Sequence, residues 1–354
     1  MRLSSVLTEA LRSTAARTSR PILALMSFVV VIGALCLYDA MTVRSIVAEF
    51  RAFHSAGATI STVVSTRGIS GRACERLAGV AGAGAAGAMS DGGGVVFEAL
   101  PSTTVPSRHV TPHFVDLLPH RVDPAIAGLL LSREVAVALG SDVGQTVATT
   151  AGPVVVAGIF DYPDDGRLPG LGWSVLVVVP ADGVFDACWL DVPFVQSPTA
   201  SFLLTAVAPS PVEKPSVSRL NSRLGEPYDV GEAVRARPSL LAVPSAAVFG
   251  VALGASLVRL RRLELASALH VGVRRSALLV QLLTENTLWL AAAWAAVPAG
   301  VLVLALSESS GDRAALLHGC LRLLVLASAA TAAGCAAGTL LVREKLLFRY
   351  AAER

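Results

Sequence analysis

The chain has 354 residues, of which 53% are hydrophobic and only 16% are charged. This composition excludes a fully soluble domain of that size and indicates an integral membrane protein with one sizeable polar domain. The net charge of +3 is small and the arginines cluster beside apolar segments, so no nucleic-acid partner is implied, and five cysteines are too few for a disulfide scaffold.

Residues 1–20 are predicted to form an amphipathic helix on the cytoplasmic face of the membrane. Leu3, Val6, Leu7, Ala10 and Leu11 repeat at helical spacing, and arginines lie among them. A frayed basic terminus is the alternative reading of the same pattern.

The first membrane span is predicted over residues 21–43. No charged residue occurs from Pro21 to Tyr38, which with a short extension is long enough to cross a bilayer. Arginines precede the run and Asp39 follows it, so the positive-inside rule places the N-terminus in the cytoplasm. No small-x-small cleavage site follows, so we expect the span to be retained.

Residues 44–237 are polar enough, and rich enough in Pro and Gly, to fold in water as an extracytoplasmic α+β domain. The expected helices are Ser70–Ala78, one that follows Ser132 and runs through Leu139 to a stop at Gly140, and Val217–Leu224. Val80–Gly94 is expected to hold a weak strand and a flexible loop. The expected strands are Ala58–Ser65, Val95–Leu100, a short one beginning at Leu129, Val154–Ile159, Val175–Val179 and Ser201–Val207.

This domain contains cysteines that could form a cross-link and histidines that could bind a metal. Cys74 and Cys188 are its only cysteines, and in a compartment that permits disulfides we expect them to be bridged, with two separately buried thiols as the alternative. His109, His113 and His120 lack the carboxylate or cysteine spacing of a metal site, so no metal is expected.

Three more apolar runs follow this domain. They predict spans at 238–258, 277–306 and 316–342, with a cytoplasmic segment at 259–276, a short outer loop at 307–315 and a cytoplasmic tail at 343–354. Two GxxxG patterns, Gly250–Gly254 and Gly334–Gly338, would allow close helix approach within the spans, although a chain this rich in Ala and Gly also produces such patterns by chance.

The segment 259–276 carries five arginines and one glutamate within its first seventeen residues, so it is assigned to the cytoplasm. A short helix is expected from Leu263 to Val271, ended by Gly272. Leu265, Ala268 and Leu269 would share one face of it by i, i+3, i+4 spacing, and we expect a partner protein or the membrane surface to cover that face.

An ordered set of residues in and after this segment resembles the FtsX/MacB-type ABC transporter permeases. Leu269 and His270 depart from the family, which tends to carry Arg and Ala there, and a plain basic loop is the other reading. The matching residues are Arg261, Arg262, Glu264, Ala266, Gly272, Arg275 and Glu285.

The predicted outer domain strengthens this resemblance. Val110–Leu118 is similar to a V-T-P-x-Y/F-F-x-L-L segment of MacB-type domains, where the apolar residues pack a helix onto a sheet. Ser132, Ala136, Leu139 and Gly140 match a further family pattern that continues through Val143–Val147 to Ile159.

The resemblance implies a homodimeric permease subunit in a bacterial cytoplasmic membrane, docked on separate ABC ATPase subunits. The implied coupling residues are Arg261, Arg262, Glu264, Leu265, Ala268, Leu269, Gly272, Arg275 and Glu285. The chain has no G-x-x-x-x-G-K-[ST] motif and only two lysines, Lys214 and Lys345, so we expect ATP and Mg²⁺ to bind the partner, and no enzyme activity or cofactor here.

Three functions remain open at this point. The first is transport or mechanotransmission, in which ATP hydrolysis by the partner moves the outer domain to extrude a cargo or lipoprotein. The second is an FtsX-like regulator of an extracytoplasmic partner, such as a cell-wall hydrolase, without transport. The third, a membrane-anchored enzyme, is disfavoured because no G-x-S-x-G, H-E-x-x-H or C-x-x-C motif is present.

Overall fold

The computed structural model describes residues 21–80, 82–193, 199–209, 211, 213–225, 228–306 and 309–343. The chain divides into two compact units, which we call the helical unit (Met1–Val47 with Gly231–Arg354) and the sheet unit (Ala48–Val230). The amphipathic helix expected at 1–20 and the tail beyond residue 343 lie outside the described residues.

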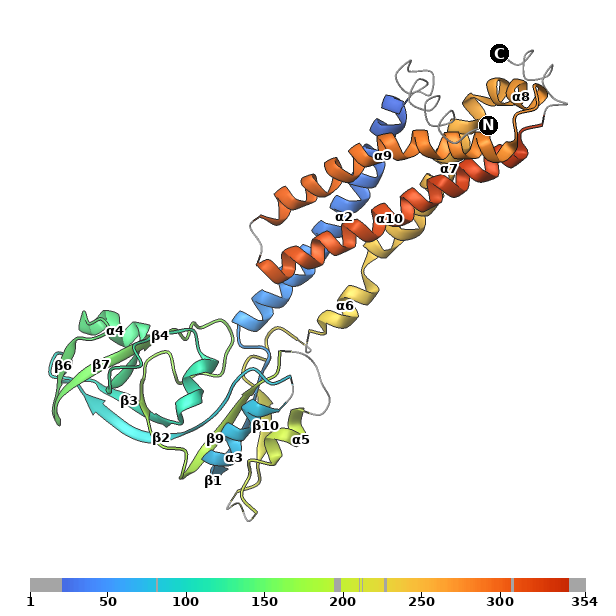
Figure 1. Ribbon diagram of the computed structural model, residues 1–354. Helices are drawn as coiled ribbons and strands as arrows, with labels where there is room; N and C mark the ends of the chain where they lie inside the picture. Colours follow the sequence, from blue (N-terminus) through green and yellow to red (C-terminus); the bar gives the residue numbers. More distant parts are fainter. Residues whose placement is uncertain are drawn as a thin grey trace. The chain divides into compact units, whose positions relative to one another are not determined.

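Long apolar helices make up the helical unit (Figure 1). Four helical segments of the described chain are long and apolar enough to cross a membrane, and the predicted number and order of spans is confirmed. The elements are α2 (Pro21–Ser55), η3 (Pro238–Leu241), α7 (Ala242–Leu260), α8 (Arg262–His270), α9 (Arg275–Ala305) and α10 (Ser310–Leu341), with α6 (Val230–Ala236) before η3.

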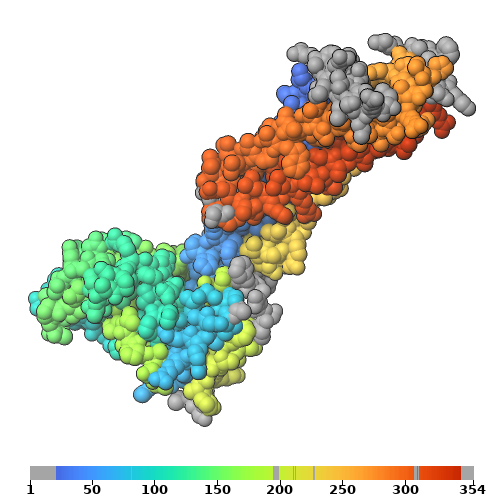
Figure 2. Space-filling view, viewed as in Figure 1, coloured from blue at the N-terminus to red at the C-terminus, as the bar shows by residue number. Residues whose placement is uncertain are grey.

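Small and aromatic side chains fill the interior between these helices. Phe28 of α2 meets Trp289 of α9 edge to face, with ring centroids 5.5 Å apart, and both are buried. In the space-filling view the orange and red surfaces of α9 and α10 adjoin (Figure 2). Asp39 of α2 accepts hydrogen bonds from Arg237 (3.1 Å) and Ser239 (2.5 Å), so a buried polar contact also joins α2 to the segment before α7.

The sheet unit contains a mixed sheet in the order β10-β1-β9-β2-β3-β8-β5-β7-β4, with β6 paired to β7. Its strands are β1 (Ile60–Ser70), β2 (Ala86–Val96), β3 (Thr104–Val110), β4 (His120–Val122), β5 (Leu129–Ser132), β6 (Thr146–Thr149), β7 (Gly152–Phe160), β8 (Val175–Val178), β9 (Val184–Asp191) and β10 (Ser216–Arg219). The β3–β8 and β5–β7 pairs are parallel, and the others are antiparallel.

Helical turns of the sheet unit begin where the sequence supplies a cap. Ser70 caps α3 (Gly71–Arg76) by accepting a hydrogen bond from the Ala73 amide, and Ser132 caps α4 (Arg133–Leu139) in the same way. Gly140 adopts φ 61° at the end of α4, the left-handed conformation expected of a glycine stop. The remaining turns are η1 (Leu77–Gly79), η2 (Pro112–Leu117) and α5 (Thr199–Leu204).

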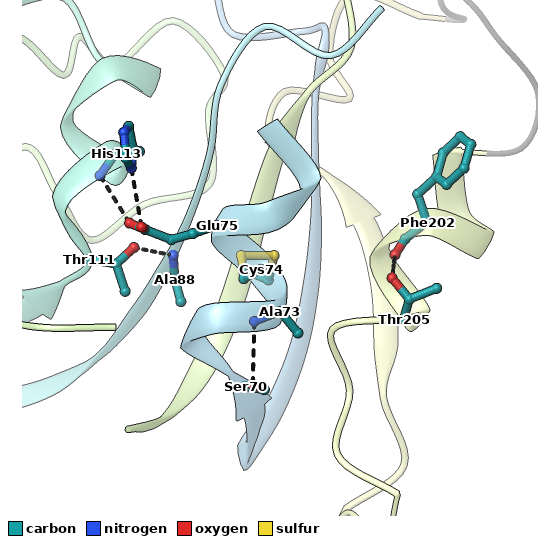
Figure 3. Close-up of a disulfide and its surroundings, with 10 residues drawn as sticks. Ser70, Ala73, Cys74, Glu75, Ala88, Thr111, His113, Phe202 and Thr205 are labelled. Atoms are coloured by element: carbon teal, nitrogen blue, oxygen red, sulfur yellow. Dashed lines mark hydrogen bonds and ion pairs between the residues drawn. A yellow bond between two sulfur atoms is a disulfide. The ribbon is translucent and has the colours of Figure 1, made fainter. Parts of the chain in front are cut away.

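The two faces of β1, β9 and β2 pack against different layers because successive side chains of a strand point to opposite sides. Val63, Ala88 and Cys188 belong to the cluster that α3 covers, and Cys188 is joined to Cys74 of α3 by a disulfide with Cα atoms 5.8 Å apart (Figure 3). Ala187 and Trp189 belong to the cluster of the other face, where Trp189 packs against Phe114 of η2.

Two local predictions for this unit are wrong. Ser201–Val207 was expected as a strand, but the chain forms α5 there, which buries Leu203, and only Val207 makes a β-bridge, to Ile69. Val217–Leu224 was expected as a helix, but Val217 lies in β10 and pairs with Val63 of β1. In both places the apolar run is too short for periodicity to separate helix from strand, so tertiary pairing decides.

The Ala- and Gly-rich stretch also differs from its prediction. Instead of a weak strand with a flexible loop, Ala86–Val96 is one strand that continues through Gly92–Gly94. The strand expected at Val95–Leu100 ends at Val96 as part of β2, and Phe97 adds only a bridge to Thr149. Gly87 explains one part of this composition, because a Cβ there would lie 2.4 Å from the Phe114 Cα and prevent η2 from packing on the strand.

Candidate functional site

The helix α8 lies between two membrane-length helices at one end of the helical unit (Figures 1 and 2). α7 ends at Leu260, Arg261 leaves the helical conformation with φ −109° and ψ 14°, and α8 follows from Arg262 to His270. α9 starts at Arg275. We call Arg261–Arg274 the elbow.

Gly272 ends the elbow helix by adopting φ 92°, a conformation that strains any residue with a side chain. Its amide donates to the Leu269 carbonyl (3.0 Å), and the Val273 amide donates to the Ala268 carbonyl (3.0 Å). This pair of bonds is the Schellman arrangement, and the apolar contact that usually accompanies it is present because Val273 packs in the same cluster as Ala268.

An ion network with a buried Arg261–Glu285 pair holds the elbow to α9. Arg261 donates to both carboxylate oxygens of Glu264 (3.0 and 2.9 Å) and, through Nη1, to Oε2 of Glu285 in α9. Gln281 donates to the other oxygen of Glu285 (3.2 Å). The hydrogen bonds from Arg261 lower the pKa of Glu264. The network therefore brings together three of the residues that carry the sequence resemblance.

Burial makes this network structurally demanding. Arg261 is 9% exposed and Glu285 is 4% exposed. Removing one member of a buried charge pair leaves its partner desolvated and unpaired, which typically costs about 3–5 kcal/mol. The buried Arg261–Glu285 pair therefore favours one position of α8 relative to α9.

Polar contacts continue next to Glu285. Asn286 donates to the Cys335 sulfur of α10 (3.0 Å) and its amide oxygen accepts from Trp289 (3.1 Å). The sequence resemblance assigns no role to Gln281 or Asn286. A signal was available, because polar residues inside a membrane span usually have a polar partner. Gln281 and Glu285 are four residues apart, which places them on the same face of a helix.

A partner protein or the membrane surface was expected to cover Leu265, Ala268 and Leu269, and the structure corrects this expectation. Leu265 is buried beside Ala266 in a cluster with Leu278 and Leu282 of α9, and Ala268 and Leu269 pack against that same cluster. The chain itself therefore covers Leu265 fully and Ala268 and Leu269 in part. Helical spacing correctly indicated which residues share a face, but it carries no information on what covers them.

The outward face of the elbow is formed by other residues. Glu264, Ser267 and His270 are exposed at i, i+3, i+6 spacing, and Val271 beyond them is 84% exposed. Arg275 is exposed as well, and its guanidinium donates to the Leu340 carbonyl (2.9 Å) near the end of α10, while Arg262 is partly buried. An exposed valine beside polar groups is the kind of surface that a partner protein can cover.

The four glycines of the GxxxG patterns lie where α7 and α10 meet. A Cβ on Gly250 would lie 2.6 Å from the Ala327 carbonyl oxygen, and one on Gly254 would lie 2.1 Å from that of Thr331. From the other helix, a Cβ on Gly334 would lie 2.2 Å from the Val251 oxygen, and one on Gly338 would meet Val258 at 3.0 Å. These glycines therefore let two backbones of one chain approach closely.

Solved structures similar to this chain are domains of transporter permeases. The periplasmic region of MacB from Actinobacillus actinomycetemcomitans aligns with 47% of this chain and 91% of its own length, at 12% identity and a TM-score of 0.34. A domain of a putative permease from Porphyromonas gingivalis aligns with 47% of this chain and 92% of its own, at 12% identity and a TM-score of 0.33.

A third structure of the same kind is the extracellular domain of the noncanonic ABC-type transporter YknZ from Gram-positive bacteria. It aligns with 41% of this chain and 88% of its own length, at 13% identity and a TM-score of 0.29. The sequence matches no family model and no curated protein.

Within the described residues, no group of three His, Cys, Asp or Glu side chains could hold a metal ion. His113 is paired with Glu75 at 3.1 Å, and Nδ1 of His120 lies 2.9 Å from the Leu118 carbonyl oxygen.

Proposed function

We propose that this chain is the permease subunit of an ABC transporter, and that the elbow couples it to a separate ATPase subunit. The observation that carries the proposal is the geometry of α8, a short helix between two membrane-length helices. Its inner side is held by Arg261, Glu285 and Leu265, while Ser267, His270 and Val271 are exposed on its outer side, together with Glu264, whose carboxylate also binds Arg261. A force applied to the outer face would reach α9 through the Arg261–Glu285 hydrogen bond and the packing of Leu265.

The finer parts of the proposal rest on the sequence resemblance. Two copies of the chain would form a homodimer docked on two ATPase subunits, which would bind the ATP and Mg²⁺. Hydrolysis would move the sheet unit outside the cytoplasmic membrane, to export a cargo, extrude a lipid or lipoprotein, or act mechanically on an extracytoplasmic partner. Substrate-stimulated ATP hydrolysis by the reconstituted complex would separate transport from regulation.

Affinity purification from the native host in mild detergent tests the coupling. We expect an ABC ATPase to co-purify with the wild-type chain and to be lost with Val271→Asp, because a carboxylate would be buried at the docking surface. Val137→Asp is the matched control, since Val137 is 75% exposed on α4 of the sheet unit. Absence of any ATPase from the wild-type preparation, or equal recovery with Val271→Asp, would count against elbow docking.

Leu265→Asp is not a suitable docking variant. Leu265 is 4% exposed within the chain's own core, so a carboxylate there would disrupt the packing of α8 on α9 before any partner is involved. Its expected effect is a loss of folded protein, whereas Val271→Asp is expected to leave the amount of folded protein unchanged.

Labelling in intact cells tests the proposed orientation. Ser102 is exposed in the turn after β2 and Ser267 is exposed on α8. We expect Ser102→Cys to react with a membrane-impermeant maleimide and Ser267→Cys to react only after the membrane is opened, since the sheet unit would lie outside and both termini inside. The opposite pattern would invert the topology.

A further inference from the structure

A pocket of about 230 Å³ opens on the sheet face opposite α3. Its floor includes Ala187 and Trp189 of β9, and its rim includes Val64 of β1, while the segment 162–171 covers one side. Ala187 and Trp189 are buried, whereas Val64 and Leu168 at the rim are each 42% exposed. The pocket therefore offers an apolar interior with an apolar entrance.

The covering segment is held in place by buried contacts. The Tyr162 hydroxyl donates to the Leu168 carbonyl (2.5 Å), and the Arg167 guanidinium lies over the Tyr162 ring at 5.5 Å from its centroid. Burial raises the pKa of the Tyr162 phenol, which stays protonated as a donor. Leu171 is buried in the same cluster as Trp189. The pocket thus has a preformed wall.

The charged side chains that line the pocket have a net negative balance. They are Asp91, Asp186 and Arg108, and Arg108 is paired with Asp91 at 3.3 Å. Asp186 accepts hydrogen bonds from the backbone amides of Arg67 (2.8 Å) and Asp91 (3.1 Å), so its carboxylate is fixed in position. A cation beside the apolar interior would be complementary to this arrangement.

We propose that this pocket binds a small amphiphile, whose apolar ring or short chain contacts Trp189 and whose cationic group lies near Asp91 and Asp186. The volume is below the roughly 300–1,000 Å³ of pockets for drug-sized ligands, so the buried part of the ligand is a single ring or a short acyl chain. The proposal goes beyond the coupling function and does not depend on it, since ligand binding is measured without an ATPase.

Calorimetric titration of the full-length chain in lipid nanodiscs tests this, with empty nanodiscs as the blank. The probes are 2-phenylethylamine, 2-phenylethanol and 3-phenylpropanoate, which share a ring and differ in charge. We expect saturable binding of the amine, roughly threefold to fivefold weaker binding of the alcohol, and still weaker binding of the carboxylate. Tightest binding of the carboxylate, or no saturable binding of the amine, would overturn the proposal.

Variants locate the binding. Val64→Trp and Leu168→Trp should each weaken amine binding at least tenfold by filling the entrance, while Val217→Trp should not, because Val217 is a similarly exposed strand residue (41%) outside the pocket. Asp91→Asn should reduce the preference for amine over alcohol. Unfolding midpoints verify that the variants fold, and unchanged amine binding in both entrance variants would exclude this pocket.

Discussion

Arg167 donates a hydrogen bond from Nη2 to the carbonyl oxygen of Ser55, the last residue of α2. Nearby, Asn221 donates to the Ala56 carbonyl (3.0 Å), so two buried side chains satisfy backbone oxygens just where the helix ends. Cationic groups at a helix C-terminus also interact favourably with its dipole. The first helix thus ends on the segment that forms the wall of the pocket.

Replacing Arg167 with Met is expected to destabilise the sheet unit by about 1–3 kcal/mol, because the Ser55 oxygen loses its donor and Asp165 loses its cation. Arg167 Nε lies 3.2 Å from Asp165 Oδ1 without hydrogen-bond geometry, so the ion pair contributes by charge alone. Chemical denaturation followed by tryptophan fluorescence measures the change. The control Arg133→Met removes an exposed pair with Asp161 and should leave stability nearly unchanged; equal losses in both variants would contradict the assigned role.

Gly254→Ala is expected to destabilise the helical unit by about 1–3 kcal/mol through overpacking against the Thr331 carbonyl. Gly300→Ala is the matched control, because Gly300 lies inside α9 and an added Cβ meets nothing within 4 Å. Thermal unfolding of both variants in the same detergent gives the comparison. A Gly254→Ala midpoint equal to that of the control would show that the two backbones can separate at no cost.

The disulfide leads to a thiol count. The chain has five cysteines, and Cys36, Cys320 and Cys335 are free. Unfolded, unreduced protein should therefore expose three reactive thiols, and detection of five would disprove the bridge. Cys74→Ala with Cys188→Ala should lower the free energy of unfolding by about 2–5 kcal/mol, since the bridge closes a loop of 114 residues.

His54 is expected to make the stability of the sheet unit depend on pH. A helix of 35 residues is about 52 Å long, so its last turns extend beyond a hydrocarbon core of about 30 Å and His54 lies outside the span. Nε2 of His54 lies 3.1 Å from Asp191 Oδ2, and this hydrogen bond raises the pKa of His54 above its usual 6.5, while partial burial opposes the shift.

Because the folded pKa is raised, the stabilisation is fully present below pH 6.5 and is lost as pH rises through the raised value. Unfolding midpoints measured between pH 6 and pH 8.5 should fall with pH in the wild type, and this fall should flatten in His54→Gln. The same slope in both proteins would mean that another group is responsible.

Sequence patterns predicted the membrane part well for a physical reason. Each span must satisfy its backbone internally and present apolar side chains, so length and hydropathy suffice to identify it. The sequence could not predict which residues pack against Leu265. Helical periodicity shows that an apolar face must be buried, but not whether this chain or a partner buries it. The sequence resemblance named Arg261 and Glu285 but could not predict that they are paired, because they are 24 positions apart in sequence.

The sheet was harder to predict. β9 lies between β1 and β2 and is buried on both faces from Ala187 to Leu190, so its sequence lacks the alternation that marks a half-buried strand. The same strand supplies Cys188 to one face and Trp189 to the other. Both the cross-link and the pocket floor therefore depend on a strand that sequence analysis missed.

β1 is the first strand of the sheet unit and β10 is the last, and the two are paired, with Ser61 opposite Arg219. The two ends of the sheet unit's strand sequence therefore lie side by side. A segment of about 160 residues thus behaves as a cassette with adjacent ends. Such a cassette can be exchanged between homologous scaffolds, or replaced by a turn of a few residues, without stretching the helices on either side. A single antiparallel ladder thus closes the unit at the point where the chain enters and leaves it.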